Sequence, residues 1–294
     1  ELTALLDLAA AMRSEPYDRR EALAGRTLAC YFTKPSTRTR VSFEAAAWRL
    51  GMLPVMLRPD ELQLGRGEPL ADTARVLSSY AAALVVRTYA QADVDALAAA
   101  ATVPVINALT DQHHPCQALA DLLTLRDRFG PLDGLRVAYV GDGNNVAHSL
   151  IEAASLAGMH TMVATPRGYE PDPTVTAHAT FAARIHGGSV HVTDDPAVAV
   201  RGAHAVYTDV WVSMGQDAER DERLAALSPY RVDRALMALA DPDAVFLHCL
   251  PAHRGDEVAA EVIDGAASAV WDQAANRLPT EQAVLHALIT GRWS

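Results

Sequence analysis

The segment Ser36–Arg40 combines the residue types that bind phosphate, and it directly follows a predicted strand. Hydroxyls and free backbone N–H groups at the start of a helix bind anions, and arginine adds a planar fork of donors. An isolated Ser-Thr pair at such a position is more often an ordinary helix cap followed by surface arginines. Five consecutive residues of these types favour an anion site over capping alone.

Two further groups of polar residues follow predicted strands in the first half of the chain. Arg87 ends a β-branched run, where it fits a salt-bridged edge residue and a ligand contact equally well. The segment 111–117 places Pro115 at the first position of a predicted helix. His114 and Gln117 are three residues apart, so both can point at one small group. The spacing of the histidines and the cysteine in this segment fits no structural zinc site, which disfavours a metal.

The segment Val140–Asn145 ends one strand and opens a helix in the second half of the chain. It imitates a dinucleotide-binding fingerprint, but Val146 stands where the third glycine belongs. No acidic residue ends the next strand, although Arg167 has the charge to bind a 2′-phosphate. The glycines therefore indicate either a tight turn or a nucleotide site, and Asn145 is a candidate ligand contact.

One later strand ends in Asp209, which Ser213 follows, and the strand 244–248 runs directly into Cys249. A lone strand-end aspartate is usually a cap or turn residue. His248 precedes Cys249, but neighbours on a strand point to opposite faces, so this histidine is poorly placed to activate the thiol. A buried structural cysteine is favoured over a nucleophile. Arg277 follows the last predicted strand and is a further anion-binding candidate.

Short apolar runs alternate with amphipathic helical segments along the whole chain, which predicts parallel sheets covered on both faces. The breaker Phe129–Pro131 separates two such halves. We therefore expect two doubly wound α/β domains with the ligand site in the cleft between them, at the carboxyl ends of the strands. The predicted strands are 27–32, 53–57, 83–88, 105–109, 136–140, 161–165, 189–193, 205–209, 244–248 and 269–271. The helices predicted in the first half are 37–50, 70–80, 92–101 and 115–129.

Composition narrows the classes of function. The 294 residues suit about two domains, and 25 Lys and Arg against 36 Asp and Glu argue against a duplex-binding protein. Lys34 is the only lysine and no P-loop surrounds it, which disfavours nucleotide hydrolysis. The three cysteines have neither the spacing of a Cys-x-x-Cys metal site nor that of a disulfide framework, which suits a reducing compartment. No apolar run approaches the length of a membrane span.

These residues together describe an anion site facing a polar site, with no metal or nucleotide signature. The simplest chemistry is group transfer from a phosphorylated donor to a second small molecule. An NADP-dependent dehydrogenase and a non-catalytic ligand-binding protein are the alternatives from other functional classes.

Four motifs resemble those of the carbamoyltransferase family. Ser-Thr-Arg-Thr-Arg and His-Pro-x-Gln are similar to the carbamoyl phosphate signatures shared across the family. His-Cys-Leu-Pro and Asp-x-x-x-Ser-Met-Gly resemble the ornithine branch, since the aspartate branch carries a Pro-Leu-Pro segment where Cys249 stands. The order and spacing of the motifs match over essentially the whole chain.

The resemblance implies a role for each matching residue. Those implied for carbamoyl phosphate are Ser36, Thr37, Arg38, Thr39, Gln63 from a neighbouring subunit, Arg87, His114, Gln117, Cys249, Leu250 and Arg277. Those implied for ornithine are Asn145, Asp209, Ser213 and Met214. Arg87, His114, Asp209 and Cys249 are the implied catalytic residues.

The resemblance also implies transfer of a carbamoyl group from carbamoyl phosphate to the δ-amine of L-ornithine, giving L-citrulline and phosphate. A related amine or amino acid is the alternative acceptor. It further implies no cofactor or metal, and a cytoplasmic homotrimer of arginine biosynthesis with shared active sites. The expected domains are 1–129 for carbamoyl phosphate and 130–277 for ornithine, with a last helix at 278–294 packing back on the first.

Overall fold

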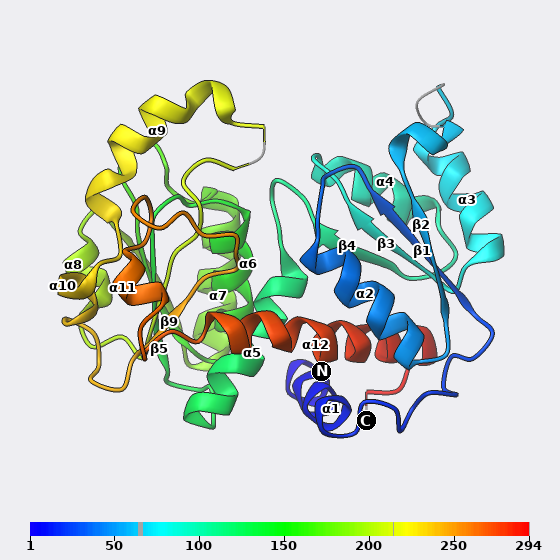
Figure 1. The fold of residues 1–294 in the computed structure, drawn as a ribbon, viewed down its shortest axis with the longest axis horizontal. Helices are drawn as coiled ribbons and strands as arrows, with labels where there is room; N and C mark the ends of the chain where they lie inside the picture. Colours follow the sequence, from blue (N-terminus) through cyan, green and yellow to red (C-terminus); the bar gives the residue numbers. More distant parts are fainter. Residues whose placement is uncertain (64–66, 214, 294) are drawn as a thin grey trace. The chain divides into compact units, whose positions relative to one another are not determined.

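The computed structural model describes residues 1–63, 67–213 and 215–293, and the chain divides into two compact units. Unit 1 comprises Glu1–Leu123 and Ala275–Ser294, and unit 2 comprises Thr124–Ala274. The division falls within two helices, α5 (Pro115–Phe129) and α12 (Val270–Thr290) (Figure 1). Within the described ranges, no helix combines the length and the apolar character that crossing a bilayer requires.

Unit 1 is built on a four-stranded parallel sheet in the order β2-β1-β3-β4. Its strands are β1 (Thr27–Phe32), β2 (Leu53–Leu57), β3 (Ala83–Arg87) and β4 (Val105–Leu109). Its other elements are α1 (Leu2–Ser14), α2 (Arg38–Arg49), η1 (Pro59–Glu61), α3 (Leu70–Tyr80) and α4 (Gln91–Ala100), besides the parts of α5 and α12 named above.

Burial on both faces explains why the central strands of unit 1 are almost wholly apolar. Every residue of β3 is buried, and Leu84 and Val86 pack with Ala74 and Leu97 in one apolar cluster. The N-terminal α1 lies beside α12 (Figure 1), where Arg13 Nη1 donates to Asn276 Oδ1 at 2.7 Å. The end of the chain is therefore part of unit 1.

Unit 2 is built on a five-stranded parallel sheet in the order β7-β6-β5-β8-β9. Its strands are β5 (Arg136–Val140), β6 (His160–Ala164), β7 (Ser189–Thr193), β8 (Ala205–Tyr207) and β9 (Val245–Leu247). Its other elements are α6 (Asn145–Leu156), α7 (Pro173–His186), α8 (Pro196–Val200), η3 (Asp217–Glu219), α9 (Arg220–Leu227), η4 (Ser228–Tyr230), α10 (Arg234–Met237) and α11 (Ala260–Ile263).

The strand orders create one topological switch point in each sheet. In unit 1, β1 lies between β2 and β3, and in unit 2, β5 lies between β6 and β8. Ligands of open parallel sheets bind beyond the carboxyl ends of strands at such points. Ligand-binding residues are therefore expected in the segments after β1, β3, β5 and β8.

The prediction of two doubly wound α/β domains is confirmed, and six of the ten predicted strands are reproduced to the residue or within one residue at one end. The strand predicted at 269–271 is wrong, because α12 begins at Val270 and only an isolated bridge joins Phe246 to Ser268. A three-residue apolar run does not distinguish a strand from the buried first turn of a helix. Arg277 consequently lies within a helix rather than after a strand.

Candidate functional site

Arg277 lies at the centre of a buried polar cluster in unit 1. Its guanidinium donates to Thr39 Oγ1 at 3.1 Å on α2 and to Gln117 Oε1 at 3.0 Å on α5. It also donates to Glu281 Oε1, one helical turn further along α12, at 3.0 and 2.5 Å. Because Arg277 is only 3 % exposed, this carboxylate is the partner that makes its burial tolerable. One guanidinium thus joins three helices of unit 1.

His114 precedes the first turn of α5 and is buried among positive charges. Burial lowers the pKa of His114 well below its usual value, and the nearby Arg277, Arg87 and Arg38 lower the pKa further. The imidazole is therefore neutral at pH 7, which leaves a ring N–H to donate without a competing positive charge. Gln117, one turn later, is oriented by a hydrogen bond from its Nε2 to Asp121 Oδ1 at 2.8 Å.

The start of α2 presents the hydroxyl and arginine residues of the Ser36–Arg40 segment. Ser36 Oγ accepts the backbone N–H of Thr39 at 3.2 Å, so this serine is also a capping residue. Thr37 and Arg38 are exposed, whereas Thr39 is buried beside Arg277. Arg87 is the last residue of β3 and is 6 % exposed.

Lys34 lies beside this segment, and its ammonium group is already engaged. It forms an ion pair with Asp111 and lies 4.3 Å from the ring centre of Tyr89. A lysine held by a carboxylate and an aromatic face has a structural role. The only lysine of the chain thus helps to hold the loops after β1 and β4 together.

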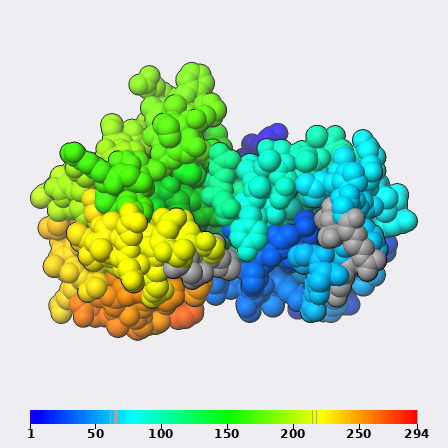
Figure 2. Space-filling view, turned by 90° about the horizontal axis from the view of Figure 1, so that it is seen from above, coloured from blue at the N-terminus to red at the C-terminus, as the bar shows by residue number. Residues whose placement is uncertain are grey.

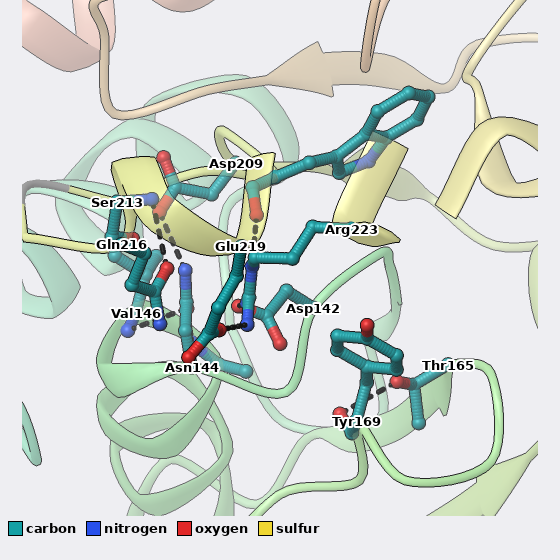
Figure 3. Close-up of polar contacts among 12 residues, drawn as sticks. Asp142, Asn144, Val146, Thr165, Tyr169, Asp209, Ser213, Gln216, Glu219 and Arg223 are labelled. Carbon is teal, nitrogen blue, oxygen red and sulfur yellow. Dashed lines mark hydrogen bonds and ion pairs between the residues drawn. The ribbon is translucent and has the colours of Figure 1, made fainter. Parts of the chain in front are cut away.

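In unit 2, Asn144, Asp209 and Cys249 form one hydrogen-bonded group. Asn144 is the N-cap of α6, and its Oδ1 accepts the backbone N–H groups of Val146 and Ala147 at 2.9 and 3.2 Å. Its Nδ2 donates to Asp209 Oδ2 at 2.8 Å (Figure 3). Cys249 Sγ donates to the other oxygen, Asp209 Oδ1, at 3.0 Å. The carboxylate is thereby held between an amide and a thiol beyond the switch point of the sheet.

A second network holds the segment that carries Cys249 and Leu250. Leu250 has a positive φ of 60°, which is strained for a leucine, and its N–H donates to His248 Nδ1 at 2.8 Å. His248 Nε2 then carries the ring proton and donates to the buried Glu257 Oε1 at 3.2 Å. Burial acts to raise the pKa of Glu257, but hydrogen bonds from His248 and the His253 backbone outweigh it and hold the pKa below its usual value. His248 thus orients the segment, and the prediction that it does not serve Cys249 as a base agrees with these partners.

Within the described residues, two groups have the spacing of metal ligands. One comprises Asp209, His248 and Cys249, and the other comprises His253, Asp256 and Glu257. In the first group, both ring nitrogens of His248 have partners and the thiol donates to Asp209. These atoms satisfy one another, so hydrogen bonding accounts for the arrangement.

The glycines of the 141–143 turn have a structural explanation. A Cβ on Gly143 would lie 2.3 Å from the backbone nitrogen of Pro171, and Gly143 N donates to Tyr169 O at 2.8 Å. The chain itself therefore occupies the space and the N–H group that a pyrophosphate would need in a dinucleotide site. Arg167, the candidate for a 2′-phosphate, is largely exposed and lies 3.6 Å from Asp194. Tight-turn packing is thus the better account of this segment.

Comparison with known proteins identifies the family. The carbamoyl-P binding domain of aspartate/ornithine carbamoyltransferase matches residues 1–127, and the Asp/Orn binding domain of the same family matches residues 133–288. An ornithine carbamoyltransferase of Acidothermus cellulolyticus is 55% identical over 289 residues, which cover 98% of this chain and 93% of that protein. The chain belongs to the aspartate/ornithine carbamoyltransferase family.

Solved structures of this family have the same fold. Ornithine carbamoyltransferase from Pyrococcus furiosus superposes with a TM-score of 0.94 at 51% sequence identity, over 99% of this chain and 93% of that one. An anabolic ornithine carbamoyltransferase from Campylobacter jejuni has a TM-score of 0.93 at 34% identity, over 99% and 95% of the two chains. The carbamoyltransferase likeness thus extends over nearly the full length.

The structure brings several of the residues singled out by the family motifs together. Arg277 contacts both Thr39 and Gln117, and Cys249 contacts Asp209. Gln63 has an exposed side chain, and Asn145 is half-buried at the first position of α6. The remaining ornithine candidates are Ser213, which is half-buried, and Met214, which lies outside the described residues.

The sequence alone did not single out several residues that shape the site. Asn144 contacts Asp209, and its place before the first helical residue was the signal for a cap. Glu281 lies four residues after Arg277, a spacing that favours an ion pair once the helix is correctly assigned. Asp142 and Arg223 are far apart in the sequence, so no local pattern could have paired them.

Proposed function

We propose that this chain transfers the carbamoyl group of carbamoyl phosphate to the δ-amine of L-ornithine, giving L-citrulline and phosphate. The observation that carries the proposal is the contact between Cys249 and Asp209 at 3.0 Å in unit 2. It puts a thiol and a carboxylate side by side where a diamino acid needs partners for its amines. The curated and solved relatives named above are ornithine carbamoyltransferases, which supports the same acceptor.

Unit 1 supplies the proposed site for carbamoyl phosphate. Ser36, Thr37, Arg38 and Thr39 bind the phosphate at the start of α2, where helix N–H groups and arginine favour an anion. Arg87, His114 and Gln117 bind the carbamoyl end. Arg277 and the backbone at Cys249 and Leu250 complete the shell of this ligand. Glu281 holds the buried guanidinium of Arg277 in one orientation, which supports this assignment because preorganised donors stabilise an anion best.

Unit 2 supplies the proposed site for ornithine. Asn145, Asp209, Ser213 and Met214 bind the α-amino and α-carboxylate groups, which leaves the δ-amine beside Cys249. Asn144 supports this role by fixing the orientation of Asp209 at 2.8 Å.

The proposed reaction is a direct attack of the neutral δ-amine on the carbamoyl carbon. An alkyl ammonium with a pKa of about 10.4 must first lose a proton to solvent, and desolvation of the pocket beside Asp209 and Cys249 favours the neutral amine. The attack creates a tetrahedral oxyanion, which Arg87, Thr39 and neutral His114 stabilise by donating to it. The C–O bond to phosphate then breaks, the attacking nitrogen gives its extra proton to the departing phosphate, and the arginines hold the resulting hydrogen phosphate. Positioning and electrostatics supply most of the acceleration.

This function is tested by measuring the carbamoylated product formed from carbamoyl phosphate and each of four acceptors: ornithine, putrescine, N-acetylornithine and aspartate. Ornithine should react well, whereas putrescine lacks the α-groups and N-acetylornithine has no α-ammonium to pair with Asp209. Aspartate has no δ-amine. Equal efficiency with acetylornithine would make the ornithine assignment wrong, and a preference for aspartate would place the chain in the other branch of the family.

We further propose a homotrimer in which Gln63 enters the active site of the next subunit, a contact that requires a closed heterologous ring. The exposed side chain of Gln63 supports this. Gln63→Ala and Arg38→Ala should each be nearly inactive alone. Refolding the two together at equal concentration should restore both residues in about a quarter of sites. No recovery of activity in a refolded trimer would mean that Gln63 acts within its own chain or not at all.

We infer that the enzyme works in the cytoplasm, in arginine biosynthesis. Cys30, Cys116 and Cys249 are all free thiols, which suits a reducing compartment. The Campylobacter jejuni relative is an anabolic enzyme, which supports the biosynthetic direction. A strain lacking the gene should require citrulline or arginine for growth, and growth without either would contradict this role.

A further inference from the structure

Arg223 is a buried arginine of unit 2 that none of the family motifs includes. It lies on α9, a helix on the surface of unit 2 (yellow in Figure 2), and most of the residues around it on that helix are exposed. Arg223 itself is only 6 % exposed. Burying a guanidinium is costly unless each donor finds a partner, so its contacts indicate what it does.

The contacts of Arg223 connect two segments that are far apart in the sequence (Figure 3). Its Nε donates to the backbone carbonyl of Trp211 at 2.7 Å, and its Nη2 forms an ion pair with Asp142. Its Nη1 lies 3.4 Å from Glu219 Oε2, and the guanidinium carbon is 5.1 Å from the ring centre of Tyr169. The planar fork thus holds a main-chain oxygen and a buried carboxylate simultaneously.

Both segments held by Arg223 carry residues of the proposed ornithine site. Asp142 belongs to the turn after β5, two residues before Asn144. Trp211 stands midway between Asp209 and Ser213. The turn and the segment after β8 are also joined by the hydrogen bond from Asn144 Nδ2 to Asp209 Oδ2. Arg223 is therefore a second connection between these two segments, in addition to that hydrogen bond.

We propose that Arg223 is a positioning residue for the amino-acid substrate, because it fixes the segment Asp209–Ser213 against the turn 142–145. This inference rests on the proposed ornithine site. Arg223 does not itself touch the substrate. Without it, Asp209 and Ser213 lose their fixed distance from Asn145, and the α-amino and α-carboxylate groups no longer meet all their partners at once. A displacement of about an ångström lowers the reaction rate by up to about a hundredfold in such sites.

The test is a split between the two substrates in steady-state kinetics. Arg223→Met keeps the length and removes the charge and the donors. Its KM for ornithine should rise about tenfold or more, whereas its KM for carbamoyl phosphate, bound by unit 1, should stay within about twofold. Arg220→Met, at an exposed position of the same helix, is the matched control and should leave both KM values unchanged.

A conservative variant distinguishes positioning from charge alone. Arg223→Lys retains an ion pair with Asp142 but cannot also reach the Trp211 carbonyl through a rigid fork. Its KM for ornithine should lie between those of the wild type and Arg223→Met. If Arg223→Met does not fold, Asp142→Asn replaces it. Its KM for ornithine should also rise while its KM for carbamoyl phosphate stays unchanged. The rise should be smaller, because the amide still accepts one hydrogen bond from the guanidinium.

Binding of norvaline, which has the α-groups of ornithine and no δ-amine, measures the same effect without turnover. In the presence of carbamoyl phosphate, Arg223→Met should bind norvaline about tenfold more weakly than the wild type. Normal norvaline binding and a normal KM for ornithine in a folded variant would overturn the role of Arg223 and leave the proposed function intact. A wild-type protein that neither forms citrulline nor binds norvaline would overturn the proposed function, and this inference with it.

Discussion

Unit 1 and unit 2 fix their polar residues in different ways. In unit 1, one buried cation, Arg277, contacts α2 and α5 directly, so the proposed anion site is joined to helices. In unit 2, the proposed ligand residues lie at the start of α6 and in the segments after β8 and β9, and Asn144, Arg223 and His248 tie these segments together. A phosphate site needs fixed positive charge, whereas an amino-acid site needs several precise distances. The difference predicts that substitutions in unit 1 mainly affect charge, and those in unit 2 mainly affect position.

Arg38→Ala should produce the largest loss of activity in this comparison. The side chain is exposed at the start of α2, so its removal leaves the fold intact while it removes a charge-assisted contact to the phosphate. We expect a cost of about 2–5 kcal/mol in transition-state binding. The assay is citrulline formation, with Arg75→Ala, whose exposed ion pair with Asp72 lies elsewhere, as the control. Near-normal turnover in Arg38→Ala would contradict the phosphate assignment.

Arg277→Ala should affect stability as well as activity, in contrast to Arg38→Ala. It leaves Glu281 buried without its cation, and burial already raises the pKa of that carboxyl against the effect of Arg277. We expect a loss of about 3–5 kcal/mol in the free energy of unfolding, measured with urea. Arg277→Ala combined with Glu281→Leu should recover most of this stability but no activity. Full stability in the single variant would show that the cluster does not depend on its charge.

Cys249→Ser should have a smaller effect, since a hydroxyl can still donate to Asp209. We expect a rate reduced about tenfold to a hundredfold and weaker ornithine binding, with turnover retained. Steady-state kinetics with varied ornithine measures both. Trapping of a carbamoyl group on Cys249 of the native protein, seen by mass, would instead indicate covalent catalysis.

Asp142→Asn should have the smallest effect on activity in this comparison, and it should also change the pH dependence of stability. Burial raises the pKa of Asp142 from 3.8 to about 6, although Arg223 opposes the shift. A carboxyl with a raised pKa in the folded state stabilises the fold at low pH, and this contribution is lost as pH rises through about 6. The free energy of unfolding of the wild type should therefore fall relative to that of the variant between about pH 4 and about pH 7, by at most about 3 kcal/mol. Parallel curves for the two proteins would be inconsistent with this charge state.

Periodicity and residue type predicted much of the fold and part of the site. Strand ends at 32, 57, 109 and 140 were located by where apolar runs stop, because burial on both faces leaves little freedom in such strands. The last helix was expected only from residue 278, whereas α12 begins at Val270, because Pro279 and a short apolar start obscured a continuous pattern. The proline has no N–H to donate, but packing of Ala283, Leu285 and Ala287 keeps the helix intact around it.

The contacts that hold the site together were not predictable in the same way. Arg277 and Thr39 are 238 positions apart, and Arg223 and Asp142 are 81 apart. Such pairs depend on strand order and on the path of the connecting segments, which residue type does not specify. Individual ligand candidates such as Thr39 and Asp209 could be chosen by motif, whereas the residues that orient them could not.

The most direct test of the central claim is to follow the new bond with isotopes. Carbamoyl phosphate labelled with ¹³C at the carbamoyl carbon is incubated with the protein and L-ornithine labelled with ¹⁵N at the δ-amine, and the product is examined by NMR. The account predicts that the carbamoyl carbon resonance of the product is split by one-bond coupling to ¹⁵N. It also predicts that this product forms much more slowly in Arg38→Ala. A product without this coupling, or no product in a protein that binds both molecules, would contradict it.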